Sequence, residues 1–241
     1  MRFPSTDWSL IASAREPSRW PAREPLAEIC SQYWHPVYAY LRQRGHRAEA
    51  AEDLTQGFFM HVIDKRVIER AAPERGRLRT LLLTCLANYV ANEQERRRAI
   101  KRGGPQPPER PEIDARVLIE PSDHMTPERI YEMQWAITLL RRVLNQLRAE
   151  FVAAGKDRVF ATLKTFLTGE RTDTGYRQAA ASLNISEAAA RVTVHRLRRR
   201  YRELLWREVA ATLCGNEQDV DGEINYLLSI VQSRWSEGGK A

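Results

Sequence analysis

Arginine is concentrated in one short stretch of this chain. Residues 187–202 contain six arginines against a single glutamate, with His195 among them. Guanidinium groups at helical spacing can bind phosphates and the acceptor edge of guanine, so this stretch indicates contact with nucleic acid. The alternative is a basic helix face that is only solvated, and the scarcity of acidic residues makes it the weaker interpretation.

The residues before this stretch predict how it is presented. Asn184 favours a left-handed helix stop, and Ser186 is a strong N-cap for the next helix. We therefore expect a helix-turn-helix over 176–202. Small residues early in its second helix and basic residues later suit entry into a major groove, although His195 could equally be a solvated surface residue. The candidate DNA-contacting residues are Ala188, Arg191, Val192, His195, Arg196 and Arg199.

A second basic cluster ends the helix predicted over 76–99. Asn88 and Asn92 lie on the polar flank of that helix. Their amides either read exposed bases or are only solvated, and cations stabilise the end of a helix in any case. Two basic helices nevertheless suggest two contacts with one nucleic acid. The basic residues of this cluster are Arg96, Arg97, Arg98, Lys101 and Arg102.

The stretch AEDLTQGFF, 51–59, differs from the rest of this basic chain. Placed on one helix, its Leu54, Thr55 and Phe58 share the core face. A second face mixes apolar, acidic and amide side chains, so it either packs on a neighbouring helix or binds a basic protein surface. The candidate binding residues on this face are Glu52, Asp53, Gln56 and Phe59.

The apolar periodicity is helical and strand signals are weak, so we expect an all-α fold. Six of the 12 prolines lie between Pro105 and Pro127, which predicts two small helical domains joined by a proline-rich linker. The main helices are expected over about 24–43, 47–66, 76–99, 126–155 and 157–168. The expected division is an N-terminal extension at 1–23, a helical domain at 24–102, the linker at 103–125, a helix-turn-helix domain at 126–209 and a tail helix within 210–241.

Composition excludes several classes of protein. The net charge of +7 favours an anionic partner: nucleic acid, an acidic protein surface or an anionic membrane. No long apolar run or signal peptide is visible, so no membrane span is expected. Cys30, Cys85 and Cys214 are far apart, which predicts no metal site or other cofactor and a reducing, cytoplasmic location. Without a phosphate loop or a nucleophile beside a base, an enzyme is the least supported class.

Together, these motifs resemble the extracytoplasmic-function class of bacterial RNA polymerase sigma factors. AEDLTQGFF is similar to the polymerase-binding motif of that class, usually written DAEDLTQEVF. RGRLRTLLLTCLANYVANEQERRR is similar to its minus-ten promoter helix, with Arg79, Thr80 and Asn88 in the pattern. YRQAAASLNISEAAARVTVHRLRRRYREL is similar to the helix-turn-helix that reads the minus-thirty-five element. The resemblance covers roughly 24–104 and 126–209.

The resemblance implies a dissociable specificity subunit of core RNA polymerase. It implies that the 24–102 domain binds the clamp helices of the largest subunit through the acidic face of 51–59. The same domain would capture an unpaired base of the melted promoter near Asn88 and Asn92. The 126–209 domain would read the upstream promoter element in the major groove.

The chain departs from the family pattern at several positions. Ala50 and Gly57 stand where the family has acidic residues, and Asn92 stands where many members have aspartate. Gly57 also costs about 1 kcal/mol of helix stability relative to alanine. Some members with fewer docking acids resemble targets of serine/threonine kinases, which makes Thr55 a candidate phosphorylation site. Its place on the core face argues against that modification.

A sigma factor is the leading interpretation of the sequence. The alternatives are a two-domain DNA-binding regulator without polymerase docking, and an adaptor whose basic helices bind an acidic protein or RNA. An anti-sigma protein, a kinase and the tail are all open as regulators. The tail has an apolar stripe that either packs on the second domain or holds the tail over the DNA-binding surface. The residues of this stripe are Ile224, Leu227, Leu228 and Val231.

Overall fold

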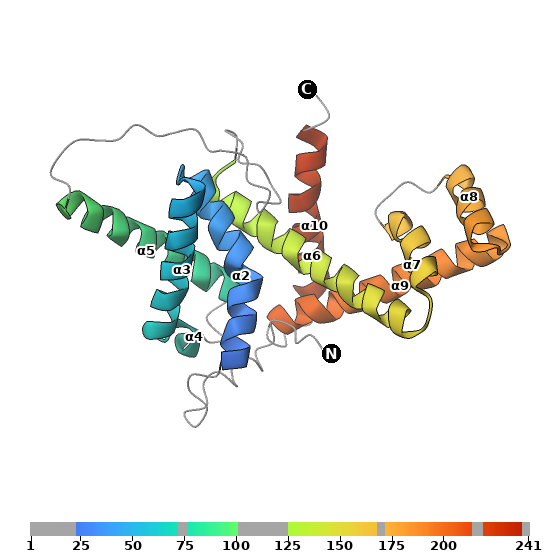
Figure 1. The fold of residues 1–241 in the computed structure, drawn as a ribbon, viewed down its shortest axis with the longest axis horizontal. Helices are drawn as coiled ribbons and strands as arrows, with labels where there is room; N and C mark the ends of the chain where they lie inside the picture. The colour runs from blue at the N-terminus through green and yellow to red at the C-terminus, as the bar shows by residue number, and fades with distance from the viewer. Residues whose placement is uncertain (1–22, 72–76, 101–124, 168–171, 214–218, 238–241) are drawn as a thin grey trace. The chain divides into compact units, whose positions relative to one another are not determined.

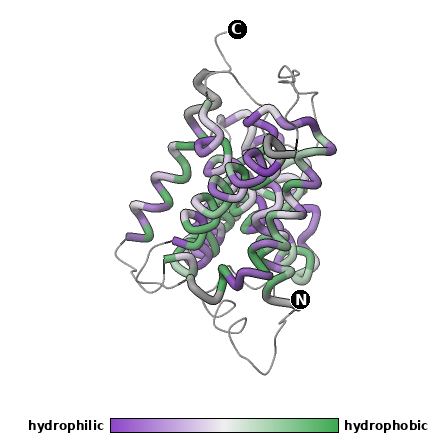
Figure 2. The backbone as a smooth tube through the Cα atoms, turned by 90° about the vertical axis from the view of Figure 1, so that its left-hand side faces the viewer, coloured by the Kyte–Doolittle hydropathy of each residue, from purple (hydrophilic) through white to green (hydrophobic). Residues whose placement is uncertain are grey.

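The computed structural model describes residues 23–71, 77–100, 125–167, 172–213 and 219–237. Every regular element in these ranges is a helix, which confirms the expected all-α class (Figure 1). Hydrophobic and hydrophilic residues alternate along these helices (Figure 2), as in helices that each bury one face. The expected N-terminal extension and linker lie outside the described residues, apart from Arg23 and Met125.

Contacts between residues divide the chain into two compact units, one of 1–138 with 210–241 and one of 139–209. These boundaries differ from those expected, because the start of α6 (Pro127–Ala153) and the tail helix α10 (Val220–Glu237) pack with α2 (Arg23–Gln43). The two domains expected from the sequence stay a prediction.

The first unit begins with helices close to those predicted. α2 is followed by α3 (Ala48–Asp64), the short α4 (Val67–Arg70) and α5 (Leu78–Ile100). Gly45 adopts a φ of 86° in the turn between α2 and α3, a conformation that favours glycine. The core of these helices includes the fully buried side chains of Tyr33, Leu41, Phe58, Leu82 and Leu86.

The tail helix α10 is part of the first unit. Its Ile230 belongs to a buried cluster with Ala39 of α2 and with Ile130 and Met133 of α6. Leu227 of α10 is also buried. The tail therefore packs on the start of α6, which belonged to the expected second domain, and on α2 as well.

The second unit contains the rest of α6 and four further elements, α7 (Asp157–Leu163), η3 (Lys164–Leu167), α8 (Asp173–Leu183) and α9 (Glu187–Thr212) as far as Val209. An ion pair between Arg142 and Glu208 joins α6 to α9. The apolar core of the unit is formed by Val143, Leu147, Phe160, Leu163, Phe166, Tyr176, Ala190, Val194 and Leu197.

Candidate functional site

The outer face of α3 presents a small acidic and apolar surface. Asp53 and Gln56 are exposed, and Met60 is 59% exposed. Positions three and four residues apart on a helix lie on one face, so these three side chains form one surface, which we call the α3 surface. Glu52 is half-buried at its edge. An apolar side chain beside acid and amide groups suits a basic partner.

The outward position expected for Phe59 is wrong. This side chain is only 5% exposed, and its ring stacks on Trp34 of α2 with a centroid distance of 5.9 Å and an interplanar angle of 13°. The helical phase of Phe59 was right, but the Trp34 ring covers this side chain. For this residue, packing on a neighbouring helix is the correct alternative.

Thr55 is fully buried on the core face of α3. Its hydroxyl donates a hydrogen bond of 2.6 Å to the carbonyl oxygen of Ala51. A phosphoryl group on this oxygen would have to enter the packed interior with its charge. The geometry therefore argues against phosphorylation of Thr55 in the folded protein.

α5 carries a polar stripe in its second half. Asn88, Asn92 and Arg96 are exposed at steps of four residues, and the Arg96 side chain is 74% exposed with a loose ion pair to Glu93 at 3.6 Å. The structure therefore brings three of the five predicted residues of this helix onto one face. The side chains of Arg97 and Arg98, like Lys101 and Arg102, lie outside the described residues.

Arg79, at the start of α5, has a role that the sequence did not reveal. Its side chain is buried and forms an ion pair with Glu223 of α10. Its guanidinium carbon lies 4.7 Å from the ring centroid of Trp135, and Arg77 also contacts Glu223 at 2.9 Å. The sequence signal for this contact is the acidic first turn of α10, with Asp221 and Glu223, which does not identify a partner.

The turn before α9 has the caps that the sequence predicts. Asn184 ends α8 in the left-handed conformation, with φ 54° and ψ 46°. Ser186 accepts a hydrogen bond of 3.2 Å from the backbone N–H of Ala189. Three residues thus separate α8 from α9, and the helix ends on both sides of the turn are capped.

One face of α9 is open to solvent. Ala190, Val194 and Leu197 are buried, and Tyr201 is half-buried with its pKa raised to about 12 by desolvation. The opposite face carries small residues first and basic residues later, and Val192 on it is 50% exposed. The exposed residues of this face are Ala188, Val192, His195, Arg196 and Arg199.

Arg191 is engaged with its own protein. It donates hydrogen bonds to Asp173 of α8 at 2.6 Å and to Glu187 at 2.8 Å. Its guanidinium carbon also lies 4.5 Å from the ring centroid of Tyr176. The hydrogen bond from Arg191 lowers the pKa of the Asp173 carboxyl below its ordinary value. Arg191 thus links α8 to α9, and binding DNA would require it to leave these carboxylates.

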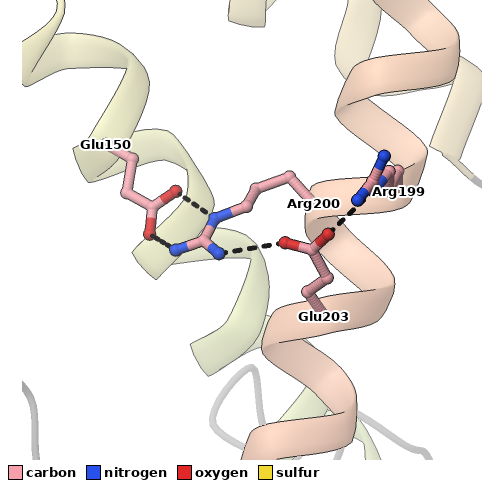
Figure 3. A network of polar contacts seen from close by, with 4 residues as sticks. All are labelled: Glu150, Arg199, Arg200 and Glu203. Atoms are coloured by element: carbon pink, nitrogen blue, oxygen red, sulfur yellow. Dashed lines mark hydrogen bonds and ion pairs between the residues drawn. The ribbon is translucent and has the colours of Figure 1, made fainter.

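Three further arginines of the 187–202 stretch contact the protein itself. Arg200 donates to both carboxylate oxygens of Glu150 in α6, at 2.8 and 2.7 Å, and also contacts Glu203 (Figure 3). Arg198 donates from Nε to the carbonyl oxygen of Phe166 at 2.8 Å. Arg199 contacts Glu203 at 3.0 Å but stays exposed. The arginine count therefore overestimates the charge that α9 presents outward.

Within the described ranges, no cluster of three or more His, Cys, Asp or Glu side chains could hold a metal ion. In the same part of the chain, no helix combines the length and apolar character needed to cross a membrane. Comparisons with protein-family models, with curated proteins and with solved structures gave no match.

Proposed function

We propose that this protein is a sigma factor of the extracytoplasmic-function class, which binds core RNA polymerase and directs it to a set of promoters. The observation that carries the proposal is the exposed face of α9 behind a three-residue turn. This face carries small side chains at its start, around Ala188, and basic side chains further along. Such a helix can approach base edges closely and place guanidinium groups on phosphates or guanine.

The α3 surface supports the polymerase part of the proposal. Asp53 and Gln56 lie on the same face as the apolar Met60, and DNA would repel the carboxylate. A basic helix pair, such as the clamp helices of the largest polymerase subunit, is the complementary partner. The polar stripe of α5 supports a third contact, because exposed asparagines beside an arginine can hydrogen-bond unpaired bases of melted DNA.

In vitro transcription tests this proposal most directly. The full chain is added to core polymerase from its own source bacterium, with the DNA upstream of its own gene as template. We expect run-off transcripts that appear only when the chain is present, and co-purification of the chain with the core enzyme. If the chain binds specific DNA but gives neither transcripts nor co-purification, the DNA-binding regulator is the correct interpretation instead. Absence of all three activities would leave the adaptor interpretation.

A further inference from the structure

Gly57 lies on α3 directly beneath the end of Tyr89, which belongs to α5. A Cβ atom built on Gly57 would lie 2.5 Å from the Tyr89 hydroxyl oxygen and 3.7 Å from the Cζ atom to which that oxygen is bonded. The first distance is closer than van der Waals contact allows, whereas the second is an ordinary contact. One oxygen atom therefore accounts for the overlap.

The Tyr89 ring is held in place from two sides. Its centroid lies 5.8 Å from that of Phe58, which is fully buried, and 5.4 Å from that of His61. These two ring contacts limit how far the phenol can move without losing its packing. A side chain at position 57 could not simply push the phenol aside without disturbing the contact between α3 and α5.

We infer that Gly57 and Tyr89 form a dependent pair, in which the Tyr89 hydroxyl takes the place of a residue-57 side chain on the α3 surface. Position 57 lies one turn after Asp53 and one turn before His61, so this place adjoins the acid that remains. Tyr89 is half-buried. A phenol oxygen can accept a hydrogen bond from a lysine or an arginine, and its ring can contact the same cation.

The inference rests on the proposed function for the identity of the partner, which is the basic surface of core polymerase. On this view, Gly57 is not a gap in the docking surface. A neutral phenol stands where a residue-57 side chain would otherwise begin, and Gly57 is the residue that leaves room for it.

A cycle of stability measurements tests the pair without any polymerase. Gly57→Ala is introduced into the wild-type chain and into Tyr89→Phe, which keeps the ring but lacks the oxygen. Alanine favours a helix over glycine, so in the Tyr89→Phe background we expect the melting temperature to rise by roughly 2–4 °C. In the wild-type background, we expect a fall or no soluble folded protein. An equal rise in both backgrounds would overturn the pairing.

A binding measurement tests the surface role. We expect Tyr89→Phe to weaken the affinity for core polymerase about tenfold, the usual cost of one hydrogen bond to a charged group. Tyr226→Phe, which removes a hydroxyl from α10 of the same unit, is the matched control and should bind normally. The double variant Gly57→Glu with Tyr89→Phe should recover affinity, which a purely structural role of Tyr89 does not predict.

The outcomes separate the inference from the function on which it rests. If Tyr89→Phe binds polymerase as tightly as the wild type, the surface role is wrong even though the protein is a sigma factor. If the wild-type chain does not bind polymerase at all, the proposed function fails together with the surface role. The stability cycle then still decides whether Gly57 and Tyr89 depend on each other.

Discussion

Arg191 lies where two helices of the second unit meet, and its hydrogen bonds and ring contact bind it to that place. If the protein binds DNA, Asp173 and Glu187 would compete with the phosphates for this guanidinium group. In the free protein, its first effect is therefore to fix the start of α8 against the start of α9. This role differs from the direct DNA contact expected from the sequence.

The pKa of Asp173 measures this interaction. The contact with Arg191 lowers that pKa, so the ion pair is intact above the ordinary pKa of aspartate and is lost as pH falls through the lowered value. We expect Arg191→Gln to return the Asp173 pKa towards its ordinary value in a carboxyl NMR titration. Arg177→Gln is the control and should change it less. An equal change in both variants would contradict the assignment.

Asp53 is the exposed acid of the α3 surface, and its charge can be reversed without touching the core. We expect Asp53→Arg to weaken binding to core polymerase by roughly a hundredfold, because two like charges would then face each other. Glu128→Arg makes the same change in net charge at an exposed position of the same unit and should bind normally. Affinity and circular dichroism of both variants provide the check. Equal affinities would place docking elsewhere.

The sequence predicted the phase of α3 correctly but not everything that covers it. Leu54, Thr55 and Phe58 are buried as expected from helical periodicity. Phe59 is buried by Trp34, a contact between residues 25 positions apart that no local pattern contains. The clash that Gly57 avoids likewise depends on Tyr89, so only the packed structure gives a reason for the glycine.

Among the elements, α9 combines exposed and internally bonded arginines. If its outer face binds DNA, Arg196→Ala should reduce the slope of log affinity against log salt by about 0.9, because one phosphate contact and its counterion release are lost. Arg200→Ala is the matched control, since Arg200 is bonded to Glu150, and it should leave the slope unchanged. Titration of a promoter duplex at several salt concentrations measures both. Identical slopes for wild type and Arg196→Ala would exclude this contact.

Helix bounds were predictable where local signals were strong. The expected 24–43 and 76–99 correspond closely to α2 and α5, and the caps at Asn184 and Ser186 bound the turn as expected. These features follow from periodicity and capping, which act within a few residues. The partners of α10 were not predictable, because an apolar stripe does not specify which of several apolar surfaces it will cover.

For the whole molecule, the tail is part of the fold of the first unit. Glu223 neutralises buried Arg79, while Leu227 and Ile230 add apolar burial. The polar stripe of α5, from Asn88 to Arg96, remains exposed. Among the described contacts, the tail therefore supports the start of α5 and does not cover that stripe.

Removing the tail tests this structural role. Truncation of residues 214–241 should destabilise the first unit by about 5 kcal/mol or more. It removes Glu223, the ion-pair partner of the buried Arg79, and exposes apolar side chains. Removal of 238–241 alone, which leaves α10 complete, is the control. Urea unfolding followed by circular dichroism measures the difference. A truncated protein as stable as the control would show that the tail is dispensable for folding.

The side-chain amide of Gln43 donates a hydrogen bond of 2.7 Å to the carbonyl oxygen of Met125, at the end of the proline-rich segment. Ile100, at the other end of that segment, belongs to the same unit. Because both ends of this connection lie in one unit, the number of residues between them sets an entropic cost of closure. Doubling the segment with glycine and serine should then cost only about 0.6 kcal/mol of unfolding free energy. The hydrogen bond from the Gln43 amide anchors this connection at Met125.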